Sequence, residues 1–76
     1  MQTSPAERIG AEVRGQMARI GMTQAALGEV LGLPQPAVSK RLRGVVAFDV
    51  NELTKVSAAL GVPLTALLGE PTSAAS

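Results

Sequence analysis

Hydrophobic residues recur every three or four positions along most of the chain, and Gly or Pro interrupts this pattern at intervals of roughly ten residues. This spacing is typical of helices that turn one side toward a core, and no stretch keeps the two-residue alternation of a strand. The pattern predicts five short helices and no sheet. We expect them to run from Pro5 to Ile20, Gln24 to Leu31, Gln35 or Pro36 to Arg43, Asp49 to Leu60, and Pro63 to Leu68.

Residues that favour helix ends stand at most of these boundaries. Ser4 and Glu7 fit a capping box at the first helix, Asp49 and Glu52 fit a second one at the fourth, and Thr23 fits a simple cap at the second. Glycines at the ends of the helices are expected to stop them. They are Gly21, Gly32, Gly44, Gly61 and Gly69.

The same spacing predicts which side chains face the core. The expected inward residues are Ala6, Ile9, Val13, Met17 and Ile20 in the first helix, Leu27, Val30 and Leu31 in the second, Val50, Leu53, Val56, Ser57 and Leu60 in the fourth, and Leu64, Leu67 and Leu68 in the fifth. Phe48 and Leu53 are expected to pack together across the start of the fourth helix. Gly10 and Gly15 are expected to weaken the first helix, because glycine is a poor helix former.

Length and composition exclude several classes of function. A chain of 76 residues forms one small domain, which we expect over residues 4–69, with a tail at 1–3 and a flexible tail at 70–76. With no Cys and no His there is no disulfide framework, zinc site or histidine acid–base chemistry, and one aromatic residue is too few to stack single-stranded nucleic acid. No nucleophile–base pair or phosphate loop is present, so we expect no enzyme, cofactor or small-molecule ligand. No signal-peptide pattern or long apolar run occurs, so we expect a cytoplasmic protein without a membrane partner.

The predicted third helix has two chemically different sides. At about 100° per residue, Ser39, Lys40 and Arg43 fall within about 60° of Pro36. The opposite side carries Ala37, Val38, Arg41 and Leu42. The net charge of +1 hides this arrangement, because all three basic residues between positions 25 and 49 lie within 40–43.

The segment before this helix favours a binding role over a merely solvated surface. A short helix precedes it, joined by the tight, glycine-containing turn at 31–34, as in a helix-turn-helix. Gln24 and Gln35 stand at the two helix starts, and a glutamine amide can contact a phosphate or read an adenine edge. A cationic helix on an apolar underside suits insertion into the major groove of DNA.

The residues of this region resemble a known family. Residues 23–33, TQAALGEVLGL, and 35–44, QPAVSKRLRG, are similar to the helix-turn-helix of the lambda-repressor/Cro superfamily of XRE-type regulators. The resemblance continues through FDVNEL at 48–53 and AALGVP at 58–63, and it covers about residues 5–69. It implies an all-α fold, a compact five-helix bundle with a helix-turn-helix. The segment around the third and fourth helices also resembles actinobacterial and actinophage regulators.

The resemblance implies roles for individual residues. Gln35, Pro36, Ser39 and Lys40 would read bases, and Thr23, Gln24, Arg43 and Arg41 are the candidate phosphate contacts. In this pattern Gln24 would also brace Gln35.

Three residues depart from the family pattern. Gly28 replaces a small residue, usually Ala, that packs against the third helix, and Pro34 replaces the usual capping Ser or Thr. Arg41 stands where relatives often bury an apolar side chain, so its guanidinium would reach either a carboxylate or a phosphate.

These observations predict a sequence-specific double-stranded DNA-binding transcriptional regulator of repressor/Cro type, with helix 36–43 in the major groove of operator half-sites. Useful specificity then needs two copies, and the homodimer could be weak, use the fifth helix and the tail, form only on DNA, or use a region outside this sequence. Such a regulator would act in the cytoplasm or nucleoid of a bacterial host. The alternative is a protein-interaction module, such as an antitoxin or adaptor, which an apolar or acidic third helix would favour.

Overall fold

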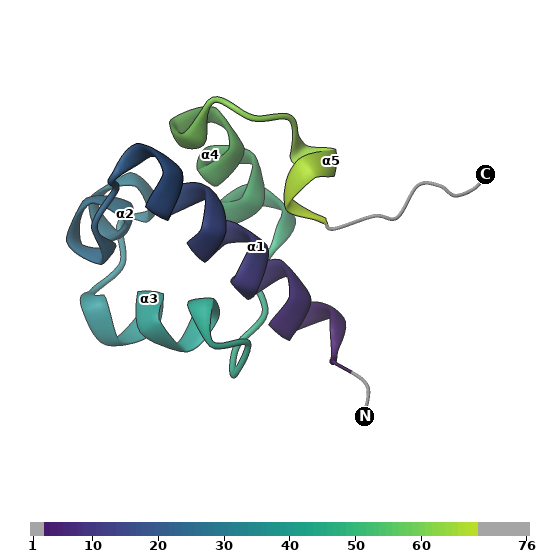
Figure 1. The fold of residues 1–76 in the computed structure, drawn as a ribbon. Coiled ribbons are helices and arrows are strands. Elements are labelled where there is room, and N and C mark those ends of the chain that lie inside the picture. Colours follow the sequence, from purple (N-terminus) through teal and green to yellow (C-terminus); the bar gives the residue numbers. More distant parts are fainter. Residues whose placement is uncertain (1–2, 69–76) are drawn as a thin grey trace.

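The computed structural model describes residues 3–68, which form five helices and no strand, as the sequence predicts. The helices are α1 (Pro5–Ile20), α2 (Gln24–Leu31), α3 (Gln35–Leu42), α4 (Val50–Leu60) and α5 (Leu64–Leu67). Figure 1 shows α1 crossing between α3 on one side and α4 and α5 on the other. The predicted stop at Gly69, the tail at 70–76 and the first two residues lie outside the described residues.

The predicted caps are present. Ser4 Oγ accepts a hydrogen bond from the Glu7 N–H at 3.1 Å, and Glu7 Oε1 accepts one from the Ser4 N–H at 2.9 Å. Asp49 and Glu52 form the second reciprocal pair, at 2.7 and 3.0 Å, and Thr23 Oγ1 accepts from the first turn of α2 at 3.0 Å. Each of these bonds satisfies an N–H group that the helix leaves free, so the helix starts are fixed locally.

A single core joins all five described helices. Val38 and Leu42, which are 0% and 1% exposed, anchor α3 in this core. Phe48 and Leu53 are both buried in it, as packing across the start of α4 requires. The buried hydrophobic residues are Val13, Met17, Leu27, Leu31, Val38, Leu42, Phe48, Leu53, Val56, Leu60 and Leu67.

Two residues predicted to face inward are exposed instead. Ile20 is 55% exposed and Val50 is 71% exposed. Ile20 is the last residue of α1 and Val50 is the first residue of α4, so each lies at a helix end. Helical spacing gives a residue's direction around the axis but not whether another element covers that end of the helix.

Three predicted helices are also slightly too long. Arg43 is the cap that follows Leu42 in α3, and Asp49 is the cap that precedes α4. Pro63 and Leu68 are the two caps of α5.

The two interior glycines of α1 differ in their surroundings. A Cβ atom on Gly15 would meet nothing within 4 Å. A Cβ on Gly10 would overlap the carbonyl oxygen of Leu42 and lie 2.9 Å from that of Arg41. Gly10 therefore allows the backbones of α1 and α3 to approach closely. The sequence predicted only that Gly10 weakens the helix and did not reveal this contact.

Candidate nucleic-acid interface

Helix α3 is supported from one side and open on the other. It packs against α1 and α2 and buries Val38 and Leu42. On its other side Pro36, Lys40 and Arg43 are exposed, as the helical wheel predicts, whereas Ser39 is half-buried. Gln35, the first residue of α3, is exposed as well. The base-reading candidates thus share one accessible side of a helix that the core holds in place.

The turn between α2 and α3 depends on a close backbone approach at Gly28. The Leu33 N–H donates to the Gly28 carbonyl oxygen at 2.9 Å, which closes the turn. A Cβ on Gly28 would lie 2.8 Å from the Leu33 oxygen and 3.5 Å from Val38 Cγ2. The tightest constraint on this position is therefore the turn itself, and α3 adds an ordinary contact.

The start of α3 lies next to the start of α2. Gln24, Gln35, Pro36 and Ser39 line one shallow hollow between the two helices. Among the described residues no hydrogen bond joins the two glutamine side chains, so the expected bracing of Gln35 by Gln24 stays a prediction. Pro34 caps α3 without a side-chain hydrogen bond, as expected of a proline.

The other end of α3 is cationic and held by the turn that follows it. The Lys40 carbonyl oxygen accepts hydrogen bonds from the Val45 N–H at 2.9 Å and the Val46 N–H at 3.3 Å. Gly44 has a φ of 80°, and a Cβ there would lie 2.6 Å from Glu7 Cα on α1. Only glycine combines that conformation with that space, so the turn and α1 together fix the end of α3.

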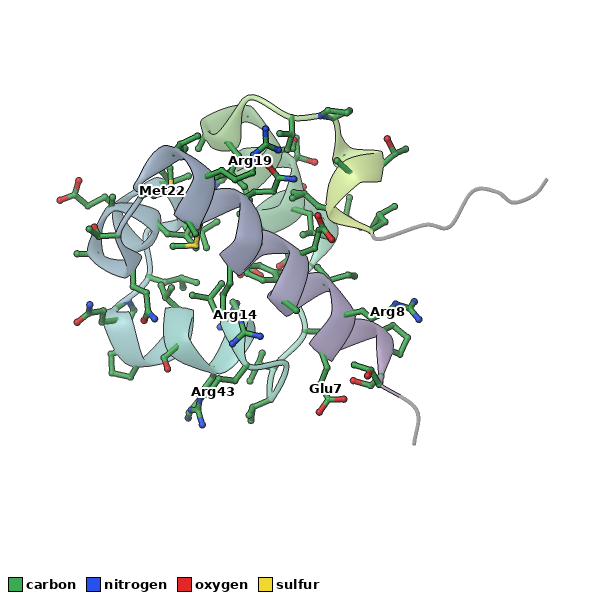
Figure 2. The ribbon with its side chains drawn as sticks, in the orientation of Figure 1. Glu7, Arg8, Arg14, Arg19, Met22 and Arg43 are labelled. Carbon is green, nitrogen blue, oxygen red and sulfur yellow. The ribbon has the colours of Figure 1, made fainter. Side chains whose placement is uncertain are left out.

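The side chains place the cations on different faces of the molecule. Figure 2 shows Arg43 extending from the end of α3 away from the other helices, whereas Arg19 lies on the far side of α1, toward α4. Lys40 and Arg43 are both exposed, and α3 contains no acidic residue. The accessible side of α3 is therefore positively charged and polar.

Arg41 turns the opposite way. Its Nε lies 3.0 Å from Glu52 Oε1, and its Nη1 donates to the Ala37 carbonyl oxygen at 3.2 Å. The side chains of Arg41 and Glu52 are only 18% and 15% exposed. The sequence left either a carboxylate or a phosphate as the partner of Arg41. In the structure the guanidinium pairs with the Glu52 carboxylate. A signal existed, because Arg41 is the one basic residue on the apolar side of the predicted helix.

Residues 16–67, most of the chain, match the family described as helix-turn-helix. The chain belongs to the Cro/C1-type helix-turn-helix family. The match confirms the family that the sequence resembles. This family consists of DNA-binding regulatory domains. Searches of curated proteins and of solved structures found no match.

The matched range of the helix-turn-helix domain includes the whole candidate surface. It begins inside α1 and extends to the last residue of α5, so it contains α2, the turn and α3. The similarity to actinobacterial and actinophage regulators stays a prediction. In the described part of the chain, none of the helices has the length and hydropathy needed to cross a bilayer.

Proposed function

We propose that this helix-turn-helix domain is a sequence-specific regulator of repressor type that inserts α3 into the major groove of an operator half-site. The observation that carries the proposal is the two-sided character of α3. Val38 and Leu42 are sealed in the core while Lys40 and Arg43 extend into solvent. An α-helix fits the major groove, and only a helix fixed from behind can present its side chains to bases in a constant register.

The proposed base contacts match the chemistry of the groove. The amide of Gln35 can pair with the N6 and N7 positions of adenine, and Lys40 can donate to O6 and N7 of guanine. Ser39 can donate or accept, and Pro36 offers an apolar surface to a thymine methyl group. Gln35, Pro36 and Ser39 line the shallow hollow between α2 and α3. Lys40 is the residue that follows Ser39 in the sequence. We assign these four residues to base reading.

The proposed phosphate contacts flank the base-reading residues. Thr23 and Gln24 stand at the start of α2, where the helix carries partial positive charge, and both are exposed. Arg43 stands at the opposite end of α3. Contacts at the two ends of the surface would fix the register of α3 along the groove, because phosphate contacts orient a protein while base contacts give specificity.

The alternative of a protein-interaction module has less support. A helix that docks on another protein would present an apolar or acidic side, whereas the exposed side of α3 is polar and carries Lys40 and Arg43. We therefore favour DNA as the partner. A bacterial cytoplasm or nucleoid is the location that fits a DNA-binding domain.

One copy of α3 can contact only a few base pairs. Specific binding therefore calls for a homodimer on paired half-sites about one helical turn apart, whose contacts form weakly or only on DNA. A selection from random duplexes tests this directly. We expect an enriched motif with two-fold symmetry; the absence of any enriched motif would contradict sequence-specific recognition.

Charge substitutions test which face binds. Lys40→Ala and Arg43→Ala should each weaken binding to the selected duplex by about tenfold, with the thermal midpoint nearly unchanged, because both side chains are exposed. Lys55→Ala is the matched control, since Lys55 is an exposed cation on α4. Unchanged affinity in both α3 variants, or an equal loss in the Lys55 variant, would contradict the assignment of the binding face to α3.

A further inference from the structure

We propose that Arg41 is a positioning residue, which holds the last turn of α3 in its DNA-binding orientation through Glu52 and does not contact phosphate. This inference rests on the proposed function. It concerns the one basic residue of α3 that the proposed contacts leave without a role. Lys40 and Arg43 face solvent on either side of it in sequence, whereas Arg41 faces α4.

Arg41 connects two helices whose side chains share the core but whose backbones do not lie against each other. Among the described helices, α3 packs against α1 and α2, and α4 packs against α1, α2 and α5, with no direct backbone packing between α3 and α4. Arg41 spans this gap with the 3.0 Å contact from its Nε to Glu52 Oε1. Its Nη1 also donates to the Ala37 carbonyl oxygen one turn earlier. Two nitrogen atoms of the guanidinium are therefore held by hydrogen bonds.

Glu52 joins this contact to the loop between the helices. The same Oε1 that receives Arg41 Nε accepts the Asp49 N–H at 3.0 Å, and Asp49 Oδ1 accepts the Glu52 N–H at 2.7 Å. The beginning of the loop is bonded to Lys40 through the N–H groups of Val45 and Val46. These hydrogen bonds attach one end of the loop to α3 and the other end to α4. The Arg41–Glu52 pair adds a direct contact between the two helices.

Burial argues against a phosphate contact for Arg41. Swinging the guanidinium out to DNA would leave the Glu52 carboxylate, only 15% exposed, without its cation. The carboxylate would then keep only the hydrogen bond from the Asp49 N–H, and a poorly solvated charge that loses its counterion is costly. In the observed arrangement the pair is neutral, so Glu52 can brace α3 without repelling DNA.

A charge-neutral double variant separates positioning from phosphate contact. R41M/E52Q keeps the apolar stem at 41 and a capping oxygen at 52, while the net charge stays the same. At a temperature where circular dichroism shows the variant folded, we expect its affinity for the selected duplex to fall by about tenfold, within the range of coupling seen for contacting residues. The slope of log K against log salt concentration should equal that of the wild type, whereas R43M, the phosphate-contact control, should reduce the slope by about 0.9.

Two results from this variant would overturn the inference. A slope reduced as in R43M would make Arg41 a phosphate contact, and an unchanged affinity would reduce the ion pair to a stabiliser of the fold. If the wild type itself selects no duplex, the proposed function fails first, so the two failures are distinguishable.

The single substitution E52Q gives an independent test, because the two possible roles of Arg41 predict opposite changes in affinity for the selected duplex. It keeps the hydrogen-bond acceptor for Asp49 but weakens the hold on Arg41. A positioning role predicts weaker binding than in the wild type, although the substitution removes a negative charge. If Arg41 were instead available to phosphate, releasing it would strengthen binding, so tighter binding by E52Q than by the wild type would overturn the proposal.

Discussion

The same substitution at two positions of α1 should have opposite effects on stability. Gly10→Ala and Gly15→Ala each place one methyl group inside a helix of 16 residues. At Gly15 the methyl would meet nothing within 4 Å. At Gly10 it would overlap the Leu42 carbonyl oxygen and come within 2.9 Å of the Arg41 oxygen. Backbone atoms cannot rotate away as side chains can, so α1 and α3 would have to separate.

The expected magnitudes follow from these surroundings. In a helix interior alanine is more favourable than glycine by about 1 kcal/mol, and Gly15→Ala should gain this amount. Gly10→Ala has the same gain, but overpacking costs about 1–3 kcal/mol, and contact with two backbone oxygens places it at the upper end. The net loss should be about 1–2 kcal/mol. For a domain of this size, Gly15→Ala should raise the thermal midpoint by about 4–8 °C and Gly10→Ala should lower it by about 4–16 °C.

Thermal unfolding followed by circular dichroism at 222 nm measures both midpoints. Urea titration gives the free energies of unfolding and shows whether the two variants unfold with the same cooperativity as the wild type. If Gly10→Ala proved as stable as Gly15→Ala, the close contact between α1 and α3 would be wrong, and with it the reason for the fixed position of α3.

The remaining predictions concern the core and the reading of bases. Leu27→Ala should lower the free energy of unfolding by about 2–5 kcal/mol, because Leu27 is 0% exposed; a change below about 1 kcal/mol in urea titration would contradict its place in the core. Gln35→Ala should relax the preference at one or two base positions in a repeated duplex selection, since Gln35 is proposed to contact base edges. An identical motif would remove Gln35 from the base-reading set.

The helices and their starts could be predicted from sequence because they depend on neighbouring residues. Ser4 with Glu7, and Asp49 with Glu52, are each three positions apart, so one short segment contains the whole hydrogen-bonded cap. The wheel of α3 succeeded for the same reason, since Val38 and Leu42 had to share a side.

What the sequence could not predict depends on contacts between distant segments. Gly10 owes its role to α3, which lies far along the chain, and the exposure of Val50 depends on where other helices end. The partner of Arg41 is 11 residues away on another helix, so spacing along the chain could not choose between Glu52 and a phosphate. The roles of Gln35, Pro36, Ser39 and Lys40 stay predictions, because their accessibility permits base contacts without demonstrating them.

The most direct test of the account is to map the bound surface by backbone amide chemical shifts. Labelled protein would be titrated with the selected duplex and with a scrambled duplex of the same length. We expect the largest changes specific to the selected duplex at Gln35, Ser39, Lys40 and Arg43, with smaller ones at the start of α2. If the specific changes instead centre on α4 and α5 and leave α3 unaffected, then α3 does not read DNA and the account is wrong.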